Sequence, residues 1–263
     1  MPTKDIVEEA KRILELVEKQ EITLRLLGGV AVKFQCPSSA YGKLQRDYAD
    51  IDFIGLKKES SEIRSLVEEL GYTSREVFNA LHGDKRLIFN DLENERRLDI
   101  FLDNFEMCHR LELKERLILN KTTIPLADLL ATKLQVVEIT EREYKDIIAL
   151  VRDHEIADQD QPETINGSYL ANLTADDWGI HKTFSINIAN VLTTLPRYEL
   201  DQIGEEIVHK GLNDLQTRFE KAPKTMRWKL RALIGEKVKW YELPEPDREI
   251  VDSPINKLNT EQV

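Results

Sequence analysis

The sequence predicts an α/β fold in the first half of the chain and helices alone in the second half. In the first half, short apolar runs of strand character alternate with segments whose apolar residues recur at helical spacing. A glycine pair, Gly28-Gly29, follows the first of these runs, where a strand turns into a helix. From Leu126 onward only the helical spacing continues, with Pro196 and Pro223 at the breaks.

Each element follows from its residue pattern. The predicted helices of the first half span residues 3–19 and 60–70, and residues 30–34 begin another. The predicted strands span 22–27 and 48–56, and strands or strand pieces are expected at 73–81, 85–90 and 96–102. Residues 91–95 form the expected hairpin turn between the last two strands, and the polar residues 36–47 form a loop.

In the second half, apolar stripes predict helices around residues 126–137 and 147–151, and then over 174–194, 197–219 and 223–240. A polar, acidic loop is expected at 153–164. We divide the chain into an α/β domain (1–125), a helical domain (126–243) and an extended or disordered tail (244–263).

Length and composition exclude several classes of protein. The 263 residues are 41% hydrophobic, which is enough to bury a core and too apolar for a disordered chain. No apolar run approaches the roughly 20 residues of a membrane-spanning helix, and the charged residues 1–19 do not resemble a secretory signal. Cys36 and Cys108, the only cysteines, are expected to be free thiols in a reducing cytoplasm.

The net charge of −11 argues against nucleic-acid binding through a general positive field and favours small substrates. Residues 221–240 depart from this balance, with seven basic residues against one acidic, a net +6. The expected buried stripe of this segment consists of Met226, Leu230, Leu233, Ile234 and Trp240. Its cations either pair with acidic neighbours around Glu205-Glu206 or meet an RNA backbone or an acidic partner.

Two carboxylates stand two residues apart within the apolar run 48–54. Side chains alternate across a strand, so Asp50 and Asp52 share one face while Ile51 and Phe53 pack on the other. The two carboxylates start about 7 Å apart, and they repel by roughly 2–3 kcal/mol at an effective dielectric near 20. A half-buried pair of this kind calls for a cation, and oxygen ligands suit Mg²⁺.

The glycine pair also has a chemical interpretation. Glycines between a strand and a helix let backbone N–H groups approach a phosphate, and the helix N-terminus favours the anion. The alternative is a tight turn that needs positive φ and binds nothing.

These motifs, in this order, resemble the nucleotidyltransferase superfamily that includes DNA polymerase β. More narrowly, they resemble the minimal nucleotidyltransferase-like proteins related to the AbiEii toxin family. The similarity covers roughly residues 20–155, and it is carried by Gly28-Gly29, Asp50-Ile51-Asp52, Leu98-Asp99-Ile100, residues 124–134 and residues 146–150. The resemblance implies a nucleotidyltransferase-like mixed β-sheet flanked by helices, followed by an all-helical domain that completes the nucleotide site.

By that resemblance, Asp50, Asp52 and Asp99 would hold Mg²⁺ or Mn²⁺ ions that bridge the phosphates of an NTP. Asp99 is the expected general base, although Asp103 offers a competing position. The alternative is a solvated strand face with ordinary surface acids.

Lys133 and Asp146 would line the nucleotide site from consecutive helices, the lysine neutralising the triphosphate and the aspartate orienting it. Arg46, just before the acidic strand, could reach a phosphate as well. The alternative makes these residues ordinary solvated ones. Residues 36–47 would form a lid, shape the acceptor pocket or be a tolerated surface insertion.

The implied activity is metal-dependent transfer of a nucleoside monophosphate from an NTP such as ATP to a hydroxyl acceptor, with release of pyrophosphate. The acceptor stays open between a tRNA end, a small molecule and a protein side chain. Kinship with AbiEii implies a toxin–antitoxin role in the cytoplasm. The chain could instead be an inactive nucleotide-binding module that acts through a protein partner, or an antitoxin-like scaffold without nucleotide affinity.

Overall fold

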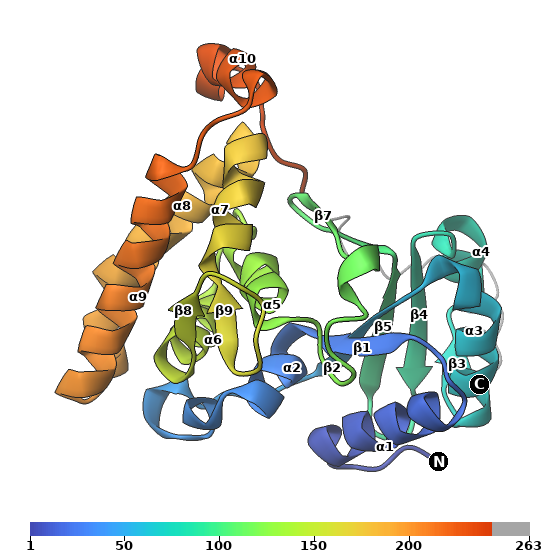
Figure 1. Ribbon diagram of the computed structural model, residues 1–263. Helices are drawn as coiled ribbons and strands as arrows, with labels where there is room; N and C mark the ends of the chain where they lie inside the picture. Colours follow the sequence, from blue (N-terminus) through green and yellow to red (C-terminus); the bar gives the residue numbers. More distant parts are fainter. Residues whose placement is uncertain (244–263) are drawn as a thin grey trace, which may run out of the picture.

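The computed structural model describes residues 1–243 and has a mixed α/β architecture (Figure 1). Its five-stranded sheet has the order β1-β2-β5-β4-β3. The strands are β1 (Leu24–Leu27), β2 (Asp50–Gly55), β3 (Thr73–Ser74), β4 (Arg86–Asp91) and β5 (Arg96–Leu102). Strands β2 and β5 run parallel, and the other neighbouring pairs of this sheet run antiparallel. The expected mixed sheet flanked by helices is confirmed.

The alternation of side chains along β2 and β5 separates an apolar face from an acidic one. The apolar face consists of Ile51, Phe53, Leu98 and Ile100, all of them fully buried. Helices α1 (Ile6–Lys19) and α3 (Ser60–Glu69) contribute to the same core. Asp50 and Asp52 therefore lie on the opposite face, as the alternation predicts.

The second half of the described chain consists mainly of helices. They are α5 (Leu126–Leu134), α6 (Glu141–Asp153), α7 (Gly167–Asp176), α8 (Trp178–Thr194), α9 (Gln202–Lys221) and α10 (Met226–Ile234). One hydrophobic core runs from the sheet through α2 (Gly28–Gln35) into α5, α6, α8 and α9. The division at residue 125 therefore marks a change in the type of element, and the core is continuous across it. Within residues 1–243, no helix is both long enough and apolar enough to span a membrane.

Residues 73–81 are not the single strand that the sequence predicts. After β3 the chain forms α4 (Glu76–His82). Asn79 on this helix accepts a hydrogen bond from the Ile88 N–H at 2.8 Å and donates one to the Ile88 carbonyl at 2.9 Å. Its side chain thus takes the place of a strand partner along part of β4.

Two predictions for the second half also need correction. The loop expected at 153–164 includes β8 (Glu155–Ala157), which pairs in parallel with β9 (Thr164–Asn166). The helix expected over 174–194 is split between α7 and α8, because Asp177 leaves helical geometry and caps α8 with its carboxylate.

Residues 36–47 form two short 3-10 turns, Pro37–Ala40 and Gly42–Leu44. Ser38 is buried, and its N–H donates a hydrogen bond to the carboxylate of Asp153 at 2.8 Å. The segment therefore packs against α6 through buried residues such as Ser38, while most of its residues, Tyr41 among them, are exposed.

The apolar stripe of α10 is exposed, so the prediction of a buried stripe is wrong. Met226, Leu230 and Leu233 are 69%, 61% and 82% exposed. Helix α10 projects from the end of the helical half (Figure 1), where no described part of the chain covers the stripe. The tail predicted over residues 244–263 lies outside the described residues.

Candidate active site

The parallel pairing of β2 with β5 brings the three predicted acidic residues together. Its register sets Asp52 opposite Asp99 and Asp50 opposite Arg97, so all four side chains lie on one face of the sheet. Asp99 is fully buried, Asp52 is half-buried, and the Asp50 side chain is 41% exposed. The carboxylates thus extend from the core to the surface along a single face.

The electrostatics of these carboxylates are unfavourable without added positive charge. Burial, followed by the negative charges of Asp50 and Asp99, raises the pKa of Asp52 to about 8. Burial also raises the pKa of Asp99, although Arg86 and Arg97 oppose the shift. Neighbouring carboxyl groups that do not all ionise easily are stabilised when a cation binds between them.

Two arginines that the sequence pattern did not single out hold Asp99. Arg86 Nη2 lies 2.9 Å from Asp99 Oδ1, and Arg97 Nε lies 2.7 Å from Asp99 Oδ2. Arg97 Nη2 also lies 3.9 Å from Asp50 Oδ2. Alternation could have found Arg97, because it precedes Asp99 by two strand positions and so shares its face. Only the register of β4 on β5 brings Arg86 there.

Gly28 begins α2 with a φ of +74°, a conformation that favours glycine. A Cβ atom on Gly28 would approach Asp52 Oδ2 closer than the 3.0 Å that real Cβ atoms keep. The preceding residue, Leu27, provides no side-chain cap, and the first turn of α2 holds no acidic residue. The glycine pair is therefore both a tight turn and an uncapped helix N-terminus beside a carboxylate.

A second charged cluster forms around Asp146 on α6, which is 2% exposed. Arg46 donates hydrogen bonds to both carboxylate oxygens of Asp146, at 2.9 and 2.8 Å, and Lys133 Nζ on α5 lies 2.9 Å from Oδ2. The Arg46 guanidinium also stacks 4.2 Å from the ring centroid of Tyr48. Arg46, Lys133 and Asp146 are therefore brought together, and none of the three is an ordinary solvated residue.

The two clusters meet at the glycine pair. A Cβ atom on Gly29 would collide with Nη2 of Arg46, just as one on Gly28 would collide with Asp52. The charge of Lys133 also acts on Asp52, where it opposes the larger effect of burial on the pKa. The predicted site residues thus form one continuous group around the first turn of α2.

Asp103 does not compete with Asp99 for a place in this group. It has a φ of +62° at the turn after β5, and its carboxylate accepts a hydrogen bond from the Lys57 N–H at 3.0 Å. Asp103 therefore stabilises a loop instead of facing Asp52.

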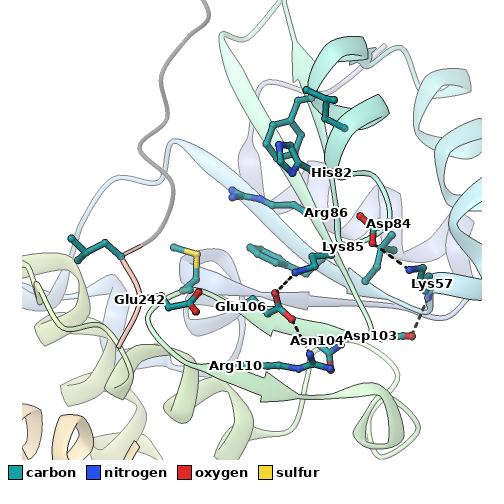
Figure 2. A pocket seen from close by; sticks show the side chains of 16 residues that line it. Lys57, His82, Asp84, Lys85, Arg86, Asp103, Asn104, Glu106, Arg110 and Glu242 are labelled. Carbon is teal, nitrogen blue, oxygen red and sulfur yellow. Dashed lines mark hydrogen bonds and ion pairs between the residues drawn. The ribbon is translucent and has the colours of Figure 1, made fainter. Parts of the chain in front are cut away.

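A cavity of about 610 Å³ lies between α4, the ends of β4 and β5, and residues 104–110 (Figure 2). Arg86, which holds Asp99, lines this cavity, and an ion pair of 3.0 Å between Lys85 and Glu106 forms part of its wall. An adjoining cavity of about 800 Å³ shares Lys85 and Glu106 and continues to Trp240. None of Asp50, Asp52 and Asp99 lines either cavity, and Arg86 alone connects the first one to the carboxylate face.

Residues 1–243 contain no ready-made group of three or more carboxylate, histidine or cysteine ligands for a metal ion. Guanidinium nitrogens lie 2.9 and 2.7 Å from the two oxygens of Asp99, and Oδ2 accepts no hydrogen bond from the described residues. The donor chemistry nevertheless fits a hard cation, since Asp50 and Asp52 present carboxylate oxygens, and burial followed by the neighbouring acids raises the pKa of Asp52. Mg²⁺ or Mn²⁺ thus fits the residues that are present.

No protein-family model matches the chain, and no curated protein sequence matches it. The resemblance to nucleotidyltransferases therefore stays a prediction, and any functional assignment rests on the geometry of the site.

Proposed function

We propose that this protein is a metal-dependent nucleotidyltransferase, which moves a nucleoside monophosphate from an NTP to a hydroxyl acceptor and releases pyrophosphate. The observation that carries the proposal is the register that sets Asp52 opposite Asp99, with Gly28 packed against Asp52 Oδ2. Carboxylates beside an uncapped helix N-terminus suit a ligand that combines phosphates with divalent cations.

The phosphates would bind at the positive side of the site. The backbone N–H groups at Gly28 and Gly29 lie at the uncapped N-terminus of α2, a position that favours a phosphate. Asp146 holds Arg46 and Lys133, so their charges are in place before a substrate arrives. Asp146 is therefore proposed as a positioning residue, and Arg46 and Lys133 as the residues that face the triphosphate.

The carboxylates would perform the chemistry. Asp50, Asp52 and Asp99 would hold Mg²⁺ or Mn²⁺, which when bound supplies neutralisation of phosphate charge and activation of a hydroxyl. Asp99 is the proposed general base, which accepts the proton of the acceptor hydroxyl. Most of the rate enhancement would come from positioning and charge stabilisation, as in other phosphoryl transfers.

The acceptor would enter through the cavity that Arg86 lines, since Arg86 also contacts Asp99. Its wall combines aromatic rings with both basic and acidic side chains. This lining therefore does not select among a tRNA end, a small molecule and a protein side chain. The acceptor therefore has to be identified by the labelling experiment described next.

Incubation with each α-labelled NTP, Mg²⁺ or Mn²⁺ and cell extract tests the proposal. We expect label on a species that nuclease, protease and filtration identify as RNA, protein or small molecule. Asp52→Asn should reduce the transfer by about 100-fold or more, whereas Asp47→Asn, at an exposed position in the preceding loop, should keep it. Absence of label with every nucleotide would remove the transferase assignment.

One observation favours a second candidate, a nucleotide-binding module without catalysis. Arg86 and Arg97 engage both oxygens of Asp99, as in a site that never uses this carboxylate as a base. Titration with ATP and Mg²⁺ separates the two candidates. A binding module retains ATP affinity without any labelled product, and Asp99→Asn leaves that affinity unchanged.

A further inference from the structure

Asp99 is held in a way that its proposed role does not explain. It is fully buried, with Arg86 Nη2 and Nε at 2.9 and 3.1 Å from Oδ1 and Arg97 Nε at 2.7 Å from Oδ2. Arg86 donates a hydrogen bond to Oδ1 and Arg97 forms an ion pair with Oδ2, so both compete with a metal ion or an acceptor proton for these oxygens. Either role requires at least one arginine to move away.

Both arginines have room to move. The side chains of Arg86 and Arg97 are 23% and 28% exposed, unlike the carboxylate that they hold. Arg86 lines the cavity of about 610 Å³ and stacks 4.9 Å from the ring centroid of Phe101, which also lines it. Arg97 reaches from Asp99 towards the half-exposed Asp50, so it spans the outer edge of the carboxylate group.

We propose that Arg86 and Arg97 are resident counter-cations of the carboxylate group, which the phosphates of the nucleotide draw away so that a divalent cation can take their place. The inference rests on the proposed function and adds an order of events to it. Without nucleotide the arginines neutralise Asp99, and the metal ion binds weakly. With nucleotide the guanidinium groups contact phosphate, and the carboxylates become available.

The chemistry of the groups supports this exchange. A guanidinium group can bind a phosphate in the same bidentate manner as it binds a carboxylate. An arginine that moves from Asp99 to a phosphate therefore exchanges one set of charged contacts for a similar set. Arg46 and Lys133 are less suited to such an exchange, because their side chains are each 11% exposed, against 23% and 28% for Arg86 and Arg97. Metal and nucleotide must then strengthen each other's binding by the same factor.

Calorimetric titration with Mn²⁺ tests the inference on the folded full chain, with and without a non-hydrolysable ATP analogue. Without nucleotide, Arg97→Gln should bind Mn²⁺ about tenfold more tightly than the wild type, a typical size for such coupling. The analogue should tighten Mn²⁺ binding to the wild type by a similar factor and to Arg97→Gln by much less. Arg97→Lys, which keeps the charge, should resemble the wild type without nucleotide.

Arg227→Gln is the matched control, because Arg227 is 76% exposed and pairs with Asp177 at 3.8 Å, away from the carboxylate group. It should leave Mn²⁺ affinity unchanged. Arg86→Gln provides the same test if Arg97→Gln does not fold.

The outcomes separate the inference from the proposed function. Equal Mn²⁺ affinities of Arg97→Gln and the wild type without nucleotide would overturn the inference, while nucleotide-dependent Mn²⁺ binding by the wild type would keep the proposed function standing. A wild type that binds no Mn²⁺ even with the analogue would overturn both.

Discussion

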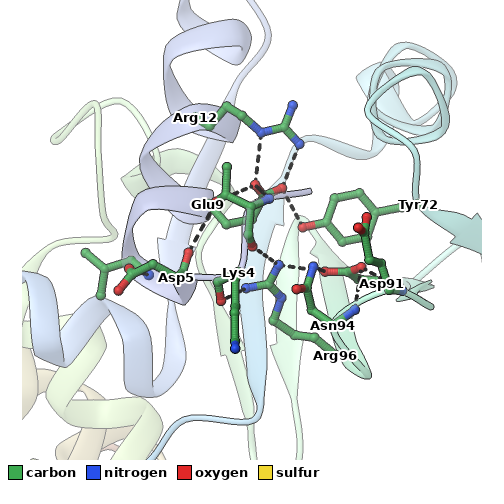
Figure 3. A network of polar contacts seen from close by, with 11 residues as sticks. Lys4, Asp5, Glu9, Arg12, Tyr72, Asp91, Asn94 and Arg96 are labelled. Atoms are coloured by element: carbon green, nitrogen blue, oxygen red, sulfur yellow. Dashed lines mark hydrogen bonds and ion pairs between the residues drawn. The ribbon is translucent and has the colours of Figure 1, made fainter. Parts of the chain in front are cut away.

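Two of the clusters of buried carboxylates in the described chain are stabilised in opposite ways. The Glu9 cluster, which joins α1 to the β4–β5 turn, consists of Glu9, Arg12, Tyr72, Asp91, Asn94 and Arg96 (Figure 3). Burial alone would raise the pKa of Glu9, but hydrogen bonds from Arg12, the Thr3 N–H and Tyr72 lower it to about 2. Every charge in this cluster has its partner within the chain.

The Asp52 cluster (Asp50, Asp52 and Asp99) has the opposite balance. Here burial and the neighbouring acids act in the same direction, and the pKa of Asp52 rises to about 8. The comparison shows that the fold can satisfy buried carboxylates completely where they serve stability. A deficit of positive charge at the Asp52 cluster is thus a feature of that site, and strongly perturbed carboxyl groups of this kind are typical of functional sites.

The largest expected effect comes from breaking the complete cluster. Arg96 Nη2 lies 2.6 Å from Asp91 Oδ2, and both side chains are at most 5% exposed. Arg96→Ala should lower the free energy of unfolding by about 3–5 kcal/mol, because it leaves a buried carboxylate without its cation. Urea unfolding measures this change.

Lys11→Ala is the matched control for Arg96→Ala, because it removes an exposed cation that pairs with Glu8 at 2.8 Å. It should change stability very little. Similar losses in the two variants would show that the Glu9 cluster is no more important for stability than a surface ion pair.

The dependence of stability on pH should differ in sign between the clusters. The pKa of Glu9 falls from 4.5 to about 2 on folding, so its contribution is present above pH 4.5 and is lost as the pH falls towards 2. This contribution is about 3 kcal/mol. The pKa of Asp52 rises from 3.8 to about 8, so the folded state loses stability as the pH rises through that interval.

Chemical denaturation between pH 3 and pH 9 checks both signs. Glu9→Gln should weaken the loss of stability in acid, and Asp52→Asn should be more stable than the wild type at pH 9. If Asp52→Asn is less stable than the wild type at pH 9, the comparison between the clusters fails.

A smaller effect is expected from Gly28→Ala, with Gly42→Ala as a control. Both glycines have positive φ, at +74° and +56°, but only Gly28 has a neighbour that an added Cβ would meet, namely Asp52. Gly42→Ala should lose about 1 kcal/mol from backbone strain. Gly28→Ala should lose roughly 2–3 kcal/mol, since overpacking adds to the strain, and it should also lose ATP binding in calorimetry. Equal losses would mean that the approach of Gly28 to Asp52 is not tight.

Local sequence patterns predicted the acidic face of the strand, but they did not predict contacts between residues that are distant in the sequence. Alternation is a property of neighbouring residues, so it is enough to place Asp50 and Asp52 together. Arg46 and Asp146 are separated by 100 positions in the chain, and their pairing depends on how α6 packs on the loop before β2. The resemblance to a known family placed both residues at one site, but not their direct contact.

Two further errors have physical causes. Arg86 reaches Asp99 through the β4–β5 register, which no single-strand pattern contains. The helical spacing of Met226, Leu230 and Leu233 predicts an apolar stripe, but spacing does not tell whether anything covers the stripe. In both cases the missing information was tertiary.

The most direct test of a cation site at the Asp52 cluster is thermal unfolding at pH 9 with a non-hydrolysable ATP analogue present throughout, with and without millimolar Mg²⁺. At this pH Asp52 is largely ionised in the folded state, since its pKa is about 8, and the charge deficit is greatest. We expect Mg²⁺ to raise the Tm of the wild type by about 5 °C and to leave that of Asp52→Asn unchanged. An equal rise in both proteins, or no rise in the wild type, would contradict a cation site at these carboxylates.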